Sequence, residues 1–245
     1  MTEQIKTTVT LAALLAEYEQ DHQDKRPDTT WANGDVRLTA SALHTWCRRQ
    51  TALAAVGTQP THPERQGQPG PHTVGTMLHE AYAAYWRRQP RTIVETPTPL
   101  GTPDVLRVDD YGDVVEVRDL KTINTRAMTM WKKQGGPPSK TWDQLAIYAY
   151  ASGANPDTVL VIDALCRDSG EAQTYTCEYD VQWGQDVAQS LQDLAADMTA
   201  RPGMQQPGRG ALDDYACQRC PYFGYCKDAA DQARQGLTVI DGGRA

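Results

Sequence analysis

The sequence predicts an α/β fold in which a central sheet is flanked by helices. Two observations support this fold class. Five short stretches with strand-like patterns lie between residues 92 and 179, and segments with apolar residues at helical intervals lie before, among and after them. A chain of 245 residues is also long enough for one large domain with a well-buried core. We therefore expect helices packed on the faces of one sheet.

Helices are expected before the first strand. Apolar residues recur at helical intervals in three segments of this part of the chain: 8–20, 41–55 and 74–88. Ser41 can cap the second helix, with Cys47 on its inner face. Residues 57–73 hold four prolines and three glycines, a composition that favours an exposed loop. The third helix carries His79.

Strands follow, together with two further helices. Apolar or alternating stretches predict strands at 92–96, 104–109, 114–121, 158–165 and 173–179. A helix at about 141–152 interrupts the strands, and another at 181–200 follows them. Beyond about residue 229 the sequence is polar, and we expect a loose tail.

The second and third strands are expected to form a hairpin with a charged end. The sequence Asp-Tyr-Gly-Asp at 110–113 fits a two-residue turn. The resulting register places Asp104 opposite Asp119, with Lys121 further along the same face. Like charges directly opposite on a sheet are destabilising, so this end would need a cation such as magnesium, unless it is merely a solvated strand end. Three further pairs are predicted: Leu106 with Val117, Val108 with Val115, and Arg107 with Glu116.

Four of the six cysteines are candidates for binding one metal centre: Cys47, Cys217, Cys220 and Cys226. Zinc and an iron-sulfur cluster suit four thiolates equally, and Pro221 favours the cluster weakly. The alternative is a disulfide pair with two bystanders. Residues 1–6 lack the apolar stretch of a secretory signal, so we expect a reducing compartment. Cys166 and Cys177 are expected to be buried, inert thiols.

Composition restricts the class of protein. The formal net charge is −7 and the isoelectric point is about 5.2, so any binding to nucleic acid must use a local basic patch. No apolar run approaches the roughly 18 residues of a membrane span. We expect a soluble, cytoplasmic protein that does not bind a membrane.

Several motifs together resemble those of the PD-(D/E)XK nuclease superfamily. They are Gly75-Thr76-Met77-Leu78-His79, Gly101-Thr102-Pro103-Asp104, Asp119-Leu120-Lys121-Thr122 and Gln144-Leu145-Ala146-Ile147-Tyr148. With the cysteines, the resemblance narrows to the RecB-like branch, which includes the CRISPR-associated iron-sulfur exonuclease, the AddB-type nuclease domain and phage-encoded relatives. It covers roughly residues 41–228. No single motif is specific, but their order is hard to obtain by chance.

The resemblance implies a restriction-endonuclease-like core with one metal site for Mg or Mn. The implied ligands are His79, Asp104, Asp119 and the backbone carbonyl of Leu120. Lys121 would orient or activate the attacking water. Gln144 and Tyr148, one helical turn apart, would line the site. The four cysteines would hold a four-iron, four-sulfur cluster.

The resemblance also implies an overall organisation and a function. A single nuclease domain would comprise a helical extension (1–40), a RecB-like core (41–200), a cysteine-cluster segment (201–228) and a loose tail (229–245). We expect a metal-dependent exonuclease that hydrolyses single-stranded DNA or DNA ends, working with a helicase or integrase partner. The alternatives are a DNA-end-binding or CRISPR-adaptation component with little cleavage, and a catalytically idle zinc-stapled module. This branch suggests a place in DNA recombination and repair.

One segment supplies the basic patch that an acidic DNA-binding protein needs. Residues 124–140 contain no acidic residue, and Gly135-Gly136-Pro137-Pro138 indicates irregular structure. Trp131 and Trp142 could stack on bases while the cations contact phosphates, or pack on the sheet instead. The candidate cations are Arg126, Lys132, Lys133 and Lys140.

Overall fold

The structure is a computed structural model that describes residues 38–41, 47–62, 69–201, 203, 215–218 and 220–234. The predicted helix at 8–20 and the end of the tail lie outside the described residues. In the part of the chain that the structure describes, no helix is long and apolar enough to span a membrane.

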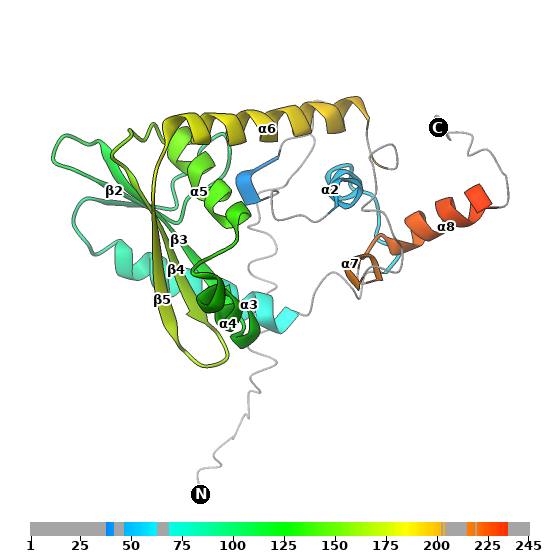
Figure 1. Ribbon diagram of the computed structural model, residues 1–245, viewed down its shortest axis with the longest axis horizontal. Coiled ribbons are helices and arrows are strands. Elements are labelled where there is room, and N and C mark those ends of the chain that lie inside the picture. The colour runs from blue at the N-terminus through cyan, green and yellow to red at the C-terminus, as the bar shows by residue number, and fades with distance from the viewer. Residues whose placement is uncertain are drawn as a thin grey trace, which may run out of the picture.

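Five strands form one mixed sheet in chain order (Figure 1). They are β1 (Thr92–Val94), β2 (Val105–Val108), β3 (Val114–Ile123), β4 (Val159–Cys166) and β5 (Ala172–Glu178). Only β3 and β4 are parallel, because two helices connect them; the other neighbours are antiparallel. All five predicted strands are present, which confirms the predicted sheet.

Helices cover both faces of this sheet. Those that lie on the sheet or on one another there are α3 (Pro69–Trp86), α4 (Thr125–Gln134), α5 (Ser139–Ala151) and α6 (Val181–Ala200). Helices α2 (Arg48–Ala55), α7 (Tyr215–Gln218) and α8 (Phe223–Arg234) lie to one side of the sheet (Figure 1). On one face, α5 packs between the sheet and α6, and Val117, Ile147 and Leu191 belong to the buried core there (Figure 1). On the other face lies α3, which contacts Thr122 through Gly75. The architecture is the predicted restriction-endonuclease-like sheet flanked by helices.

The β2–β3 hairpin follows the predicted register except near its turn. Beyond Arg107 the register shifts, so Val108 faces Val114 and not Val115 as predicted. The shift leaves Val115 partly exposed. Two predicted pairs are present: Leu106 with Val117, and Arg107 with Glu116.

The hairpin turn is also wider than the two-residue turn that the sequence suggests. The carboxylate of Asp109 accepts hydrogen bonds from the backbone N–H groups of Tyr111 and Asp113, at 2.8 and 3.0 Å. Gly112 takes the positive φ of 89° that closes the turn. Capture of two backbone amides by Asp109 therefore moves the turn one residue towards β2.

Residues 124–140 are largely helical, which corrects the prediction of an irregular segment. Asn124 caps α4 by accepting a hydrogen bond from Ala127 N at 2.8 Å. Gly135, with φ 79°, supplies the left-handed residue that commonly ends a helix. Pro138 then immediately precedes α5. The Gly-Gly-Pro-Pro sequence is thus a helix boundary and not a sign of a long loop.

The predicted loop at 57–73 is likewise shorter than expected, because α3 begins at Pro69. Proline is tolerated in the first turn of a helix, where its missing N–H has no helical partner to lose. In the described part of the second predicted helix, α2 starts at Arg48, and Cys47 is its N-cap residue in an extended conformation. Cys47 therefore precedes the helix and does not lie on its inner face as predicted; residues 42–46 lie outside the described residues.

Candidate active site

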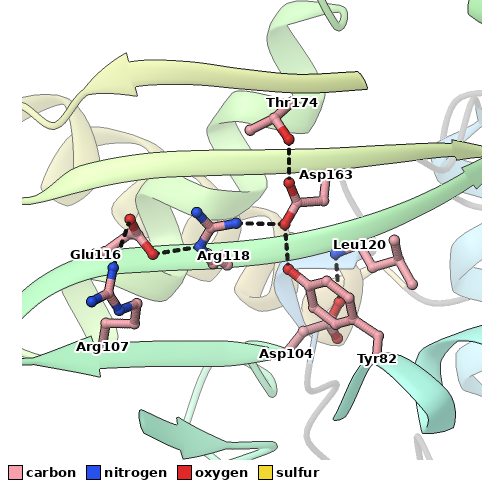
Figure 2. A network of polar contacts seen from close by, with 8 residues as sticks. All are labelled: Tyr82, Asp104, Arg107, Glu116, Arg118, Leu120, Asp163 and Thr174. Atoms are coloured by element: carbon pink, nitrogen blue, oxygen red, sulfur yellow. Dashed lines mark hydrogen bonds and ion pairs between the residues drawn. The ribbon is translucent and has the colours of Figure 1, made fainter. Parts of the chain in front are cut away.

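Two aspartates meet at the open end of the β2–β3 hairpin. Asp119 lies within β3 and is only 3% exposed. Asp104 directly precedes β2, whose first residue Val105 faces Arg118, so Asp104 lies at the level of Asp119. Its Oδ2 accepts a hydrogen bond of 2.7 Å from the backbone N–H of Leu120, as Figure 2 shows. The Asp104 side chain thus accepts a backbone hydrogen bond of the kind that a neighbouring strand would accept, and this bond holds the Asp104 carboxylate beside β3.

Helix α3 brings His79 to the same place from the other face of the sheet. Its Nδ1 lies 3.3 Å from Asp104 Oδ2. Burial lowers the pKa of His79, but the hydrogen bond and the negative charge of Asp104 outweigh it, so the pKa is raised above 6.5. The proximity favours an imidazolium that offsets part of the acidic charge.

A chain of polar contacts links Lys121 to α5. Lys121 Nζ lies 2.7 Å from Asp119 Oδ2 and donates a hydrogen bond of 2.7 Å to Gln144 Oε1. The amide nitrogen of Gln144 donates to the hydroxyl of Tyr148 at 2.9 Å. Burial raises the pKa of Tyr148, so it stays a neutral phenol. The structure therefore brings together these predicted site residues, with Gln144 and Tyr148 on one face of α5.

Gly101 lies beside this site, and its membership of a motif was the only sign of a role that could be read from the sequence. Its φ of 132° is one that residues with a side chain rarely adopt, and a Cβ there would lie 2.9 Å from Tyr148 Cε1. The backbone at Gly101 therefore approaches the Tyr148 ring more closely than any other residue type would allow.

The buried carboxylate of Asp119 is electrostatically costly in this arrangement. Burial raises its pKa to about 6; Lys121 opposes that rise, and the charge of Asp104 adds to it. Lys121 Nζ pairs with Asp119 Oδ2 at 2.7 Å, and beyond this ion pair no hydrogen-bond donor of the described residues reaches that buried oxygen. An additional positive charge at this oxygen would lower the cost of burying the Asp119 carboxylate and would offset its repulsion from Asp104.

A divalent cation fits this set of donors, although the present arrangement does not enclose one. Two carboxylates and an imidazole are ligands that magnesium or manganese accepts. In the described part of the chain, however, no three or more His, Cys, Asp or Glu side chains are arranged to hold a metal ion. At this site His79 Nδ1 lies against Asp104, and Lys121 Nζ lies against Asp119.

The four predicted cluster cysteines lie at the two ends of the described chain, which pack together. Burial raises the pKa of Cys220, and the charges of Cys47, Cys226 and Cys217 add to that rise, so these three thiols are close enough to act on Cys220 electrostatically. In the part of the chain that the structure describes, the cysteine side chains are nevertheless not arranged to hold a metal ion. All six cysteines are described, and none forms a disulfide, which removes the disulfide alternative in this structure. Cys166 is buried as expected, whereas Cys177 on the edge strand is half-buried.

Contacts between residues 47–62 and α8 hold these ends together (Figure 1, right). Arg49 Nη1 donates to Cys226 Sγ at 3.5 Å. Thr61 Oγ1 donates to the carbonyl of Pro221 at 3.1 Å and accepts from Gly224 N at 3.0 Å. The sulfurs are thus part of a packed unit built from distant parts of the sequence.

The predicted basic segment exposes its cations but not its central tryptophan. Trp131 is buried and meets the ring of Tyr175 edge-on, with centroids 6.1 Å apart. Its indole is therefore closed to a base, which corrects the stacking prediction for Trp131; Trp142 packs partly buried against the core. Lys132 pairs with Glu171 of the β4–β5 hairpin. The exposed cations are Arg126, Lys132, Lys133 and Lys140.

The sequence matches the model of the PD-(D/E)XK nuclease superfamily over residues 2–227, and the chain belongs to that superfamily. No curated protein sequence matches the chain.

Solved structures with a similar fold include that of SSO0001, with a TM-score of 0.52 and 16% sequence identity; the match covers 89% of this chain and 95% of that one. The structure of LHK-Exo in complex with dAMP gives a TM-score of 0.42 and 13% identity, over 82% and 95% of the two chains. The alkaline exonuclease LHK-Exo from Laribacter hongkongensis gives 0.37 and 16%, over 64% and 73%. The likeness to SSO0001 shows a shared fold.

Proposed function

We propose that this nuclease uses a divalent metal ion, magnesium or manganese, to hydrolyse phosphodiester bonds of DNA. The observation that supports the proposal best is Asp119: a buried carboxylate with a raised pKa, which pairs with Lys121 at 2.7 Å and lies beside a second carboxylate, Asp104. Lys121 compensates one of these negative charges, and a bound cation would compensate the other. The other ligands that we propose are Asp104, His79 and the backbone carbonyl of Leu120.

A bound metal ion would supply an acidified water and screen the charge that develops on the phosphate. Side chains of the protein would position the water and stabilise the phosphate. Lys121 places a fixed positive charge beside the attacked phosphate and orients the water. Gln144 holds the lysine ammonium at 2.7 Å, and Tyr148 holds the Gln144 amide at 2.9 Å, so the lysine is positioned from α5.

We propose an exonuclease that acts on single strands or free ends, on the basis of the resemblance to the RecB-like branch. Supporting features lie on α4, whose cations Arg126, Lys132 and Lys133 offer an acidic protein a local surface for phosphates. Lys140 lies in the first turn of α5, and the four cations together form the DNA-contacting set that we propose. Unwinding of duplex would come from a helicase partner; an integrase is the alternative partner.

We further propose that Cys47, Cys217, Cys220 and Cys226 hold a four-iron, four-sulfur cluster, with zinc as the alternative. The nearness of four half-buried thiols from both chain ends supports this proposal. The cluster would be structural, and the protein would belong to the reducing cytoplasm. The organisation that we propose is one nuclease domain with a helical extension (1–40), a core (41–200), a cysteine segment (201–228) and a loose tail (229–245).

Incubation of anaerobically purified protein with end-labelled and internally labelled DNA tests the proposal. Single- and double-stranded substrates are compared with magnesium, manganese or EDTA. We expect mononucleotides or short oligonucleotides from single strands or ends, only when metal is present. Degradation in EDTA, or equal degradation by the Asp119→Ala variant, would contradict the assignment. Metal-dependent DNA binding without cleavage would favour the DNA-end-binding alternative.

A further inference from the structure

Helix α3 packs on the sheet with little apolar burial. Among residues 74–86, the only buried side chain is that of Ala83, and Met77 and Tyr85 are 47% and 51% exposed. Near its start, Gly75 lies against the sheet, where a Cβ would come within 3.1 Å of Thr122 Oγ1. Sparse apolar contacts such as these hold the helix against the sheet, but they do little to fix its position along β3.

A polar network fixes that position. Asp163 on β4 accepts hydrogen bonds from Tyr82 Oη at 2.5 Å, from Arg118 Nη1 at 2.6 Å and from Thr174 Oγ1 at 2.7 Å (Figure 2). Arg118 also pairs with Glu116. The carboxylate of Asp163 and the guanidinium of Arg118 are 19% and 17% exposed, so loss of a partner leaves charge with little access to water. Burial and the nearby Asp163 raise the pKa of Tyr82, which keeps its hydroxyl protonated as a donor.

The signal for this network in the sequence is a lone carboxylate in a buried strand. Asp163 interrupts the apolar run Val159-Leu160-Val161-Ile162, and a charged residue at such a place requires partners. Arg118 and Tyr82 are those partners, and they come from elements that the sequence could not place beside β4. Sequence reasoning assigned no role to any of the three.

Contacts at three levels set the register of α3 along β3. The helix runs antiparallel to the strand, and the contacts are Gly75 with Thr122, Tyr82 with Asp163, and Trp86 with Arg118, whose guanidinium lies 4.8 Å from the Trp86 ring centroid. Eleven helical residues rise about 16 Å, and four strand residues span about 13 Å, so the outer contacts match in length. His79 lies between them, one turn from Gly75 and from Tyr82 on the face that meets the sheet.

We infer that the Tyr82–Asp163–Arg118 network is a positioning device for the active site, because it holds α3 in the register that brings His79 against Asp104. The inference rests on the proposed function, in which both residues bind metal. The network also holds β3 on either side of Asp119, the proposed metal ligand. Arg118 directly precedes Asp119 in the strand. Leu120 directly follows it and pairs with Asp163 of β4. The three side chains act through His79 and do not touch the substrate.

Two variants of the full chain test the inference, Tyr82→Phe and Asp163→Asn, with Tyr85→Phe as the matched control. Tyr82→Phe keeps the ring and removes only the hydroxyl that bonds Asp163; Tyr85 lies on the same helix but outside the network. The first measurement is Mn²⁺ binding without DNA, followed by electron paramagnetic resonance of the free ion. We expect the affinity to fall about tenfold in both network variants, as is usual when residues behind a ligand are lost, and to be unchanged in the control.

The second measurement distinguishes positioning from general stabilisation. Pulsed paramagnetic resonance of bound Mn²⁺ should show a coupling to an imidazole nitrogen of His79 in the wild type. This coupling should weaken in Tyr82→Phe and be absent in His79→Asn. DNA cleavage by Tyr82→Phe should recover at high Mn²⁺, with an unchanged KM for DNA.

The possible results separate the inference from the proposed function. Wild-type Mn²⁺ affinity and nitrogen coupling in Tyr82→Phe would overturn the inference, even if its melting temperature falls. If Asp163→Asn does not fold, Tyr82→Phe decides alone. A wild-type protein that binds no Mn²⁺, or binds it equally after Asp119→Ala, would overturn the proposed function and the inference with it.

Discussion

At the scale of single residues, the site combines groups that are unfavourable in the fold without a ligand. Asp119 is buried, its pKa is raised to about 6 by burial, and Asp104 lies close enough to add to that rise. His79 and Lys121 supply positive charge from opposite faces of β3. Functional sites are often less stable than the rest of a fold, and replacement of their charged groups then removes function without loss of stability.

Asp119→Asn should therefore abolish cleavage without destabilising the protein. The substitution keeps the shape of the side chain but removes a negative charge that is both buried and close to Asp104. We expect DNA hydrolysis to fall at least about 1000-fold, a loss of roughly 4 kcal/mol in transition-state stabilisation, while the melting temperature in EDTA stays equal or rises. Single-turnover assays and thermal unfolding measure the two effects. A lower melting temperature together with residual activity near wild type would show that this carboxylate has a structural role instead.

Gly101 should be the glycine whose replacement damages the site. In Gly101→Ala the new Cβ meets the Tyr148 ring at 2.9 Å, in addition to the strain of a φ of 132°. Gly112→Ala is the control, since Gly112 has a φ of 89° but open space around it. Both variants should lose about 1–3 kcal/mol of stability from backbone strain, measured by denaturant unfolding. Only Gly101→Ala should also lower kcat, because displacement of Tyr148 disturbs Gln144. Equal kcat values would contradict this.

At the scale of elements, much of the sheet could be predicted from the sequence, because period-two patterns and β-branched residues report directly on half-buried strands. The hairpin shows the limit. Its register was correct from Val105 to Arg107, where apolar burial determines which residues face each other. Near the turn, side-chain capture of the backbone by Asp109 determined the geometry, and local pattern does not reveal that contact.

Helix α4 shows a second limit. Its segment has few strong periodic signals, and Gly135 and Pro138 suggested a loop, whereas in the structure they end one helix and precede the next. Its N-terminus is held partly by Asp168 Oδ2, which accepts a hydrogen bond of 2.8 Å from Thr125 N. A contact between residues this far apart in sequence depends on the completed sheet. Lys132 pairs with Glu171, so its replacement would also break this ion pair. Other residues of α4 are therefore better suited to a test of DNA binding.

Arg126 and Lys133 are the better pair for testing whether α4 contacts DNA. They lie two helical turns apart on one exposed face. The double variant Arg126→Glu with Lys133→Glu should weaken single-strand binding and flatten its dependence on salt by about two units of slope or less, because fewer counterions are released. Lys227→Glu, an exposed lysine on α8, serves as the control. Binding is measured across a salt series in calcium; unchanged affinity and slope would remove α4 from the DNA path.

At the scale of the whole molecule, the packed chain ends lie beside the sheet, and Ala52 of α2 belongs to the same buried core as Val117 and Leu191. The cysteine spacing predicted that the two ends would meet, because one Cys-x2-Cys pair needs further ligands from elsewhere. Hydrogen bonds between the two ends support that prediction: His62 N donates to the Pro221 carbonyl at 2.9 Å, and the hydroxyl of Tyr225 donates to the carbonyl of Gln59 at 3.1 Å. The sequence could not predict these contacts individually, since none involves a recognisable motif.

Cys220→Ser should release the chain ends while the sheet stays folded. Because metal binding at such sites contributes to folding, loss of one ligand should remove the metal and separate α2 from α8. Anaerobically purified wild type should be brown with about four irons per chain, as expected of a cubane held by four thiolates. The variant should be colourless, with faster amide exchange in residues 47–62 and 220–234 but not in β3 or β4. Cys177→Ser, a half-buried thiol on the edge strand, should keep the iron. Colourless wild type with one zinc would support the zinc alternative, and unchanged exchange in Cys220→Ser would show that the protein contacts alone hold the two ends together.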